Sequence, residues 1–161
     1  RYGSTRLPGK PLADIAGKPM IERVYDRVSQ ATKTECTIVA TDDDRVYSAV
    51  QQFGGTVMMT DPNHPTGTDR LAEVASHYTD LDVVINVQGD EPMIEPNLID
   101  DLARLFEEDP NLQMATVATP LLEEEYDEPS AVKVILNNRN DAMYFSRSLP
   151  MVSPTIRAHF R

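Results

Sequence analysis

Short apolar runs rich in β-branched residues alternate along this chain with longer segments whose apolar residues recur at helical spacing. The runs predict strands at residues 36–40, 56–59, 83–87, 114–119 and 132–136. The longer segments predict helices at residues 19–32, 46–53, 69–78 and 96–108, the second capped by Asp42 or Asp43 and stopped by Gly54 and Gly55. Strands that alternate with helices of this length are typical of βαβ units. We therefore expect an α/β fold with three layers and a mostly parallel sheet.

The run at residues 83–87 is the most apolar of the predicted strands. A strand of that composition is expected at the centre of a parallel sheet, where helices cover both of its faces. Ligands of open parallel sheets bind at the carboxyl ends of the strands. Three segments that follow predicted strands are therefore candidates for a site: residues 41–42, 61–70 and 88–92.

The chain is acidic, with a formal net charge of −11 over 161 residues. This balance argues against nucleic acid and anionic membranes as partners, because both need a basic surface. No stretch approaches the roughly 20 apolar residues of a membrane-spanning helix, and no signal segment opens the chain. We therefore expect a cytoplasmic protein. Its single cysteine, Cys36, lies in an apolar run and is expected to be a buried hydrophobe.

One domain over residues 1–161 is the default for a chain of this length. Both ends look cut, because no apolar strand precedes Arg1 and no clear element closes the chain at Arg161. The fold is therefore expected to be incomplete at both ends.

The opening loop concentrates positive charge in this acidic chain. Within ten residues it holds three cations, two hydroxyls and flexible glycines: Arg1, Ser4, Thr5, Arg6, Gly9 and Lys10 are the relevant ones. Arginine grips phosphate with two hydrogen bonds, and lysine supplies a compact charge. The loop therefore suits a triphosphate or pyrophosphate, although it lacks the order of a Walker A loop. A frayed basic terminus is the alternative interpretation.

Asp90 follows the most buried predicted strand, in the segment Gln88-Gly89-Asp90-Glu91-Pro92. A carboxylate in that position is desolvated at some cost unless it holds a cation. Magnesium binds through one or two carboxylates plus substrate phosphates, so Asp90 is a candidate ligand. The alternative is that Asp90 caps the next turn, which is the interpretation we favour for Glu91.

The segment 64–70 combines hydroxyls, a glycine and a predicted helix start, which together suit an anion-tolerant wall of a pocket. Thr68 or Asp69 acting as an ordinary helix cap explains part of it equally well. His64, His77 and His159 have no ligand spacing with one another or with Cys36, so a zinc site is not expected.

Five segments in this order resemble signatures of the 3-deoxy-manno-octulosonate cytidylyltransferases, also called CMP-Kdo synthetases. They are residues 1–12 (RYGSTRLPGKPL), 39–42 (VATD), 66–73 (TGTDRLAE), 87–92 (VQGDEP) and 144–147 (YFSR). The similarity runs from Arg1 to about Pro150. It implies a Rossmann-like nucleotidyltransferase fold, a homodimer, Mg²⁺ as cofactor, and CTP and Kdo (3-deoxy-manno-octulosonate) as substrates. The products would be pyrophosphate and CMP-Kdo for lipopolysaccharide biosynthesis.

The resemblance also implies roles for individual residues. The CTP phosphates would be held by Arg1, Ser4, Arg6 and Lys10. Cytidine would lie near Thr41, Asp42, Pro65, Thr66, Gly67 and Thr68. Asp90 would ligate magnesium, and Gln88, Arg70 and Arg147 would face the sugar acid. Arg6, Lys10 and Asp90 are the expected catalytic residues.

The chain departs from the family in two places: the apolar strand that precedes the position of Arg1 is absent, and so is the C-terminal third, with its second metal-binding aspartate. Several functions stay open from the sequence. They are transfer to another sugar acid (8-amino-Kdo or a sialic acid), a non-catalytic nucleotide-binding module, and a structural α/β domain.

Overall fold

The computed structural model describes residues 7–148 and 156–159 of the chain. The chain divides into two compact units, Arg1–Leu112 and Gln113–Arg161, which are described separately below. The sequence-based expectation of one domain over residues 1–161 stays a prediction.

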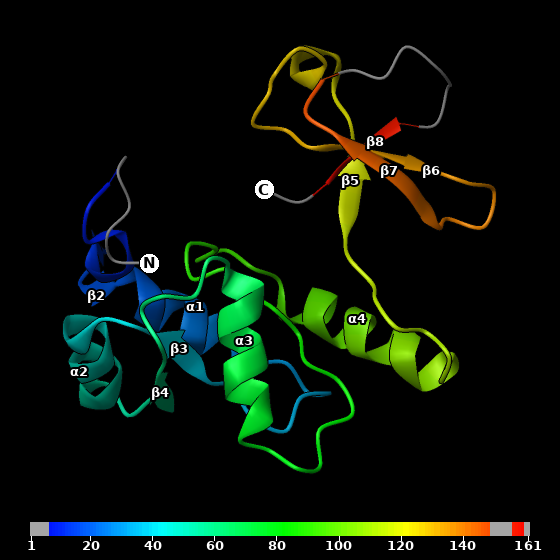
Figure 1. The fold of residues 1–161 in the computed structure, drawn as a ribbon. Coiled ribbons are helices and arrows are strands. Elements are labelled where there is room, and N and C mark those ends of the chain that lie inside the picture. The colour runs from blue at the N-terminus through cyan, green and yellow to red at the C-terminus, as the bar shows by residue number, and fades with distance from the viewer. Residues whose placement is uncertain (1–6, 149–155, 160–161) are drawn as a thin grey trace. The chain divides into compact units, whose positions relative to one another are not determined.

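In its described part the first unit holds one short 3₁₀ helix, four α-helices and four strands (Figure 1). In chain order they are η1 (Lys10–Leu12), β1 (Asp14–Ile15), β2 (Lys18–Pro19), α1 (Met20–Val28), β3 (Val39–Thr41), α2 (Asp44–Gln52), β4 (Val57–Met59), α3 (Gly67–Ser76) and α4 (Pro96–Glu108). Strands β1 and β2 form an antiparallel hairpin, and its turn uses the left-handed backbone of Ala16 and Gly17.

Strands β3 and β4 pair in parallel, and helix α2 connects them along the chain. This is the βαβ unit expected from the sequence. Asp43 caps α2 by accepting a hydrogen bond from the backbone N–H of Arg45 at 3.0 Å. The helix ends before Gly54, whose φ of 81° suits a glycine. Its inward face supplies Val46 and Val50 to a core whose third buried member is Ile21 of α1.

Helices α1 and α4 are joined by polar contacts over a long stretch of sequence. Asp100 of α4 is buried and accepts hydrogen bonds from the backbone N–H groups of Thr32 and Lys33, each at 2.8 Å. Arg27 Nε donates to the carbonyl oxygen of Ile94 at 2.9 Å. Burial alone would raise the pKa of Asp100, but the hydrogen bonds from Lys33 and Thr32 outweigh it and lower that pKa. The turn after α1 is therefore fixed to α4.

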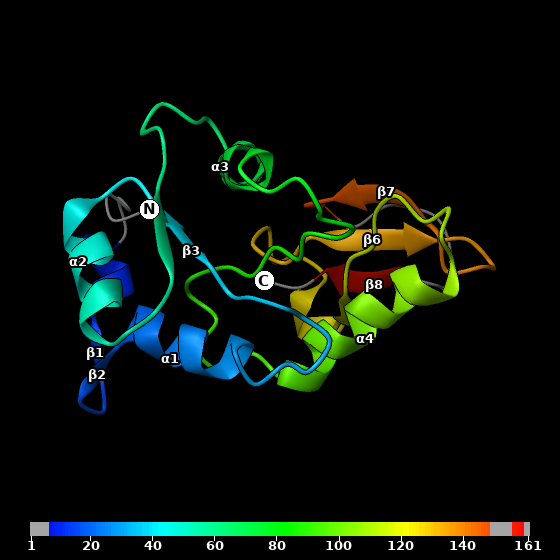
Figure 2. The ribbon, with the colours of Figure 1, turned by 90° about the horizontal axis from the view of Figure 1, so that it is seen from below.

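The second unit is a four-stranded antiparallel sheet in the order β5-β8-β6-β7. Its elements are β5 (Ala118–Pro120), η2 (Glu123–Glu125), β6 (Lys133–Leu136), β7 (Ala142–Ser146) and β8 (Ile156–His159), and Figure 2 shows β6, β7 and β8 from another side. Val134 and Lys133 are almost fully buried. The Lys133 ammonium donates to the carbonyl oxygens of Glu128 at 2.6 Å and Arg147 at 3.3 Å.

The predicted helices are all present, and α4 has the predicted bounds. Three expectations differ from the structure. Residues 83–87 are irregular, because in the described part of the chain no strand pairs with them. The strands expected at 114–119 and 132–136 lie in the antiparallel sheet, since the short connection from β6 to β7 forces a hairpin. Cys36 is exposed. The α/β class is confirmed, and no helix among the described residues could cross a membrane.

Candidate active site

Lys10 and Asp90 lie 80 positions apart in the sequence and touch in the structure. The distance from Lys10 Nζ to Asp90 Oδ2 is 2.5 Å, and the two side chains are 35% and 45% exposed. Lys10 begins the short helix η1, and Gly9 caps that helix with a φ of 74° that favours glycine. The end of the predicted phosphate loop and the predicted metal ligand therefore face the same solvent-accessible place.

The turn that carries Asp90 is held by its own backbone. Glu91 N–H donates to the Gln88 carbonyl at 3.2 Å, and Ile94 N–H donates to the Glu91 carbonyl at 3.1 Å. At Gly89 a Cβ atom would come within 3.3 Å of Ile21 Cδ1, so the turn passes close to α1. Burial and then the nearby Asp90 carboxylate raise the pKa of Glu91, whereas Lys10 lowers it. A second negative charge beside Asp90 is therefore unfavourable unless a cation offsets it.

This arrangement suits a magnesium site in which substrate phosphates supply some of the ligands. In the described part of the chain no group of three or more His, Cys, Asp or Glu side chains could hold a metal by itself. Magnesium needs only one or two protein carboxylates when substrate phosphates supply further oxygens. Asp90, with Glu91 next to it, meets that requirement at the place where Lys10 already balances negative charge.

Arg70, on the first turn of α3, is buried with 7% exposure. Its Nη1 donates to Thr60 Oγ1, and its Nη2 donates to Asp42 Oδ2 at 2.8 Å. Thr60 in turn donates its hydroxyl to the carbonyl oxygen of Thr41 at 3.0 Å. The residues that follow β3 and β4 are thereby joined to the start of α3.

The loop from β4 to α3 is fixed to the helix at two points. Thr66 caps α3 and shares a capping box with Asp69, so the cap lies earlier than the predicted Thr68 or Asp69. Glu73 accepts hydrogen bonds from the backbone N–H of Asp61 at 2.9 Å and from His64 Nε2 at 2.5 Å. The Asp61 bond and then the His64 bond favour the carboxylate and lower the pKa of Glu73. The other residues predicted to lie near the cytidine, Pro65, Gly67 and Thr68, are exposed to solvent.

The other predicted site residues fall in different places. Gln88 is exposed, and its Nε2 donates to Asn86 Oδ1 at 3.3 Å. Arg147 belongs to the second unit, where its Nη1 donates to the Pro129 carbonyl at 3.0 Å. Arg1, Ser4 and Arg6 lie outside the described residues.

Sequence reasoning missed Thr60 and Glu73, and it named His64 as part of the candidate segment 64–70 without its partner Glu73. Thr60 directly follows the short apolar strand β4 and is buried at 4% exposure. Glu73 stands three positions after Arg70 on one helix, so both reach the same side of α3. That spacing was the available signal for Glu73, whereas nothing local marks His64 as its partner.

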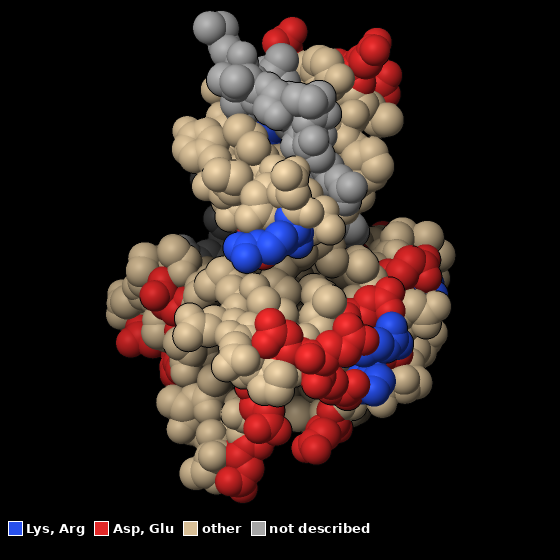
Figure 3. All heavy atoms as spheres, turned by 90° about the vertical axis from the view of Figure 1, so that its right-hand side faces the viewer, with Lys and Arg blue, Asp and Glu red and all other residues tan. Residues whose placement is uncertain are grey.

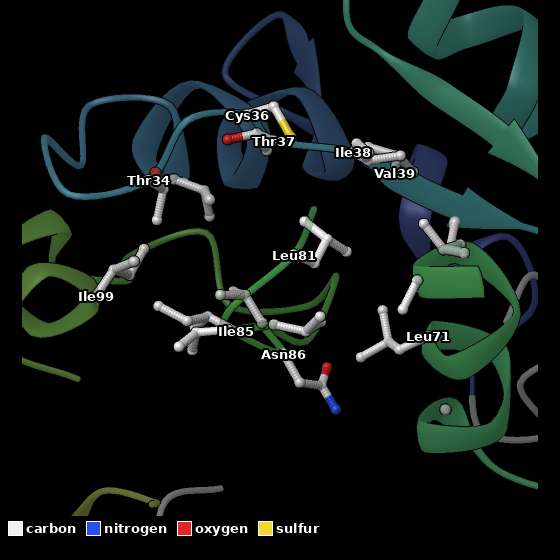
Figure 4. Close-up of a pocket in the computed structure, with 18 of the residues that line it drawn as sticks. Thr34, Cys36, Thr37, Ile38, Val39, Leu71, Leu81, Ile85, Asn86 and Ile99 are labelled. Carbon is white, nitrogen blue, oxygen red and sulfur yellow. The ribbon is translucent and has the colours of Figure 1, made fainter. Parts of the chain in front are cut away.

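A hollow of about 1750 Å³ lies in the first unit beside this site. In Figure 4 the segment from Thr34 to Val39 forms one side, and Leu81, Ile85 and Asn86 form the other, with Leu71 of α3 and Ile99 of α4 at its ends. The lining includes Lys10 and Asp90. On the face shown in Figure 3, acidic side chains cover more of the surface than basic ones.

Cytidylyltransferases are similar to this chain in sequence and in fold. A sequence model of the family described as Cytidylyltransferase matches residues 1–160. The 3-deoxy-manno-octulosonate cytidylyltransferase of Escherichia coli is 53% identical over 148 residues, which are 92% of this chain and 60% of that protein. The enzyme of the same name from Syntrophotalea carbinolica is 51% identical over 149 residues, covering 92% of this chain and 59% of that protein. This chain thus spans about three fifths of the length of these relatives.

The solved structures agree with the sequence comparison. CMP:2-keto-3-deoxy-manno-octonic acid synthetase, solved in complex with CTP, superposes with a TM-score of 0.92 at 48% identity, covering 99% of this chain and 68% of that one. A cytidylyltransferase from Leptospira borgpetersenii, at 21% identity and a TM-score of 0.62, covers 79% of this chain and 53% of its own, and shares the fold alone. The match over nearly every residue, together with the contact between Lys10 and Asp90, leads to one conclusion: the chain belongs to the cytidylyltransferase family.

Proposed function

We propose that this chain is the nucleotide-binding part of an enzyme that transfers a cytidylyl group from CTP to Kdo, giving CMP-Kdo and pyrophosphate for lipopolysaccharide biosynthesis. The observation that carries the proposal is the contact of Lys10 with Asp90, because it brings the end of the phosphate loop to the predicted metal ligand. Relatives about 50% identical to the chain bear the name of this activity.

The proposed role of the opening loop is to neutralise the phosphates of CTP. Lys10 supplies an ammonium group next to Asp90. Arg1, Ser4 and Arg6 precede it in the sequence and are proposed to complete the phosphate contacts. In an otherwise acidic chain these cations are the groups that can attract a triphosphate.

Asp90 is the proposed ligand of Mg²⁺, and Glu91 stands beside it. When bound, Mg²⁺ would withdraw charge from the phosphate oxygens of the nucleotide. The Asp90 side chain is 45% exposed, three positions after the run at residues 83–87, so a nucleotide held by the opening loop can reach its carboxylate.

The proposed reaction is an in-line displacement at the α-phosphorus of CTP. The anomeric hydroxyl oxygen of Kdo forms a bond to that phosphorus, and the bond from it to the oxygen shared with the β-phosphate breaks. Pyrophosphate leaves with the bonding electron pair, and the hydroxyl proton passes to solvent. Arg6 and Lys10 contribute by positioning the phosphates and offsetting the charge that develops on their oxygens.

The remaining residues are proposed to recognise the cytidine of CTP and the acceptor sugar acid. Thr41, Asp42 and the loop Pro65, Thr66, Gly67 and Thr68 would lie near the cytidine, since they follow the carboxyl ends of β3 and β4. Gln88 is exposed beside Asp90, which suits a contact with the acceptor. The family resemblance implies acceptor contacts for Arg147 and Arg70.

We further propose that residues 83–87 form a strand of a three-layer, mostly parallel, Rossmann-like sheet. Strand β3 pairs with β4 on one edge only among the described strands. The hollow separates its other edge from residues 83–87, and Val83 and Val84 face it while 37% and 50% exposed. One apolar strand between the two would cover both edges, and the family resemblance implies such a strand before the position of Arg1.

Hydrogen exchange tests this part of the proposal. In a longer version of the protein that carries the preceding strand, the amide hydrogens of residues 83–87 should exchange far more slowly than in the 161-residue chain. Equal exchange in both proteins would refute the strand. Two other expectations, a homodimer and a cytoplasmic location, stay predictions that light scattering and cell fractionation can check.

Pyrophosphate release by the longer protein tests the activity. Kdo, 8-amino-Kdo and a sialic acid are offered in turn with CTP and Mg²⁺, and Kdo should give the fastest release. Asp90→Asn should reduce the rate by about 10², as loss of one transition-state contact does. Faster pyrophosphate release with another sugar acid would identify that sugar acid as the acceptor. CTP binding without pyrophosphate release would favour a non-catalytic module.

A further inference from the structure

Arg70 is the buried member among the charged candidate site residues that the structure describes. Its side chain is 8% exposed, against 35% for Lys10 and 45% for Asp90. A charged group removed from water is costly unless partners satisfy it. Arg70 has them, because both terminal nitrogens of its guanidinium donate hydrogen bonds within the protein.

The partners of Arg70 come from two strand ends. Thr60 follows β4, and Asp42 follows β3, whose last residue is Thr41. Thr60 is bound twice to the Thr41 carbonyl, through its backbone N–H at 2.8 Å and its hydroxyl at 3.0 Å. Arg70 itself belongs to α3. One side chain therefore sets the spacing between the carboxyl ends of two parallel strands and a helix start.

The Asp42 carboxylate is paired with the same guanidinium. Its side chain is 17% exposed, and the Arg70 guanidinium at 2.8 Å is its ion-pair partner in the described structure. A charge-assisted hydrogen bond of this kind is stronger than one between neutral groups. Without Arg70, a poorly hydrated carboxylate would stand beside the place proposed for an anionic nucleotide.

We propose that Arg70 is a positioning residue for the nucleotide, acting through Asp42, Thr60 and the start of α3, and does not contact the sugar acid. This inference rests on the proposed function and narrows it, because the sequence resemblance implied an acceptor contact for Arg70. Both terminal nitrogens of the guanidinium donate hydrogen bonds in the interior, and a side chain that is 8% exposed offers its other N–H groups little access to a second substrate.

The test separates the affinities for the two substrates in the longer protein. Arg70→Gln should weaken CTP binding, measured by calorimetry, about ten- to hundredfold, the effect of removing a charge-assisted partner. The KM for Kdo should stay within about twofold, because no acceptor contact is lost. Arg70→Lys should recover part of the CTP affinity, since an ammonium can still pair with Asp42 but lacks the two-pronged reach of arginine.

A double-mutant cycle with Asp42→Asn adds a readout that a general loss of stability would not give. Because the two residues act as a pair, Arg70→Gln combined with Asp42→Asn should weaken CTP binding less than the sum of the single changes. Arg104→Gln is the matched control, since Arg104 lies exposed on α4 and pairs with Asp101. It should leave both affinities unchanged.

Three results would overturn the inference. One is a raised KM for Kdo with normal CTP binding, which would make Arg70 an acceptor contact. Another is a lower midpoint of urea unfolding with both affinities unchanged, which would make its role purely structural. The third is a wild-type protein that does not bind CTP, which removes the proposed function as well. A wild-type protein that binds CTP without releasing pyrophosphate refutes the activity alone, and the calorimetric comparison still decides the role of Arg70.

Discussion

Replacing Lys10 with methionine should separate what this residue does for folding from what it does for the nucleotide. The Lys10–Asp90 pair is exposed at 35% and 45%, so water screens it. Exposed ion pairs contribute about 0.2–1 kcal/mol to stability. Lys10→Met should therefore lower the free energy of unfolding by no more than about 1 kcal/mol, since the methionine keeps most of the apolar stem.

The effect on the reaction should be larger. In the proposed complex the same ammonium faces phosphate oxygens in a site that excludes part of the water. Loss of one preorganised donor to developing charge reduces a rate by about 10², which corresponds to about 2.7 kcal/mol. The loss of transition-state stabilisation should thus exceed the loss of folding stability at least twofold.

Two measurements on the same protein decide the matter: the rate of pyrophosphate release and the midpoint of urea unfolding. Lys18→Met is the matched control. Lys18 is also an exposed lysine at 40%, and it bridges two carboxylates, Glu22 and Asp26, outside the residues that line the hollow. Its replacement should leave pyrophosphate release unchanged.

The reasoning fails if Lys10→Met unfolds at a much lower urea concentration while release of pyrophosphate continues at the wild-type rate. That outcome would mean that the contact with Asp90 maintains the fold and takes no part in the chemistry. Equal loss of release in Lys18→Met would also count against it, because the effect would then be a general response to lost positive charge.

Three further changes test the packing and the pH dependence of the structure. A Cβ atom at Gly55 would lie 2.5 Å from Cε2 of Phe53, so Gly55→Ala should lower the free energy of unfolding in urea by about 1–3 kcal/mol. Val134 is 1% exposed, so Val134→Ala should cost about 2 kcal/mol, measured by loss of the antiparallel sheet on heating. The Asp61 hydrogen bond lowers the pKa of Glu73 below its usual 4.5, so its carboxylate stabilises the fold above that pH and loses this effect as the pH falls through the lowered value. Glu73→Gln should therefore be less stable than wild type at neutral pH, and the difference should shrink in acid; a difference that persists in acid would contradict this assignment.

Helices were predicted well because their signals are local. The spacing of apolar residues, the Asp43 cap and the left-handed Gly54 all act within a few residues of α2. The predicted start of α3 was two residues late because Thr66, whose hydroxyl makes the cap, precedes a glycine that reads as loop.

Strands were harder because a strand exists only where another backbone pairs with it. Composition alone made residues 83–87 the strongest strand in the sequence, yet no described strand bonds to them. Likewise, the run at residues 132–136 is apolar enough for a parallel sheet, but the partner at β7 is close in sequence and arrives antiparallel. Hydrophobicity showed where strands lie and did not show what they pair with.

The site was predictable to the extent that the topology rule applies. Asp90 was expected at the carboxyl end of a strand and Lys10 in a phosphate loop, and the structure brings the two side chains into contact. The burial of Arg70 was not foreseen, because an arginine in a polar loop motif reads as a ligand. Its partners, Asp42 and Thr60, are 28 and 10 positions away, and only the folded arrangement brings them together.

The ties between α1 and α4 have a consequence for the order of folding during synthesis. Thr32 and Lys33 bond to Asp100 across 68 and 67 positions, so these hydrogen bonds cannot form until that aspartate has left the ribosome. Contacts between such distant residues form slowly, because the intervening loop must close first. Until then this contact does not shield the early part of the nascent chain, which stays accessible to proteases and chaperones. Slowing translation just before residue 100 should prolong that accessibility.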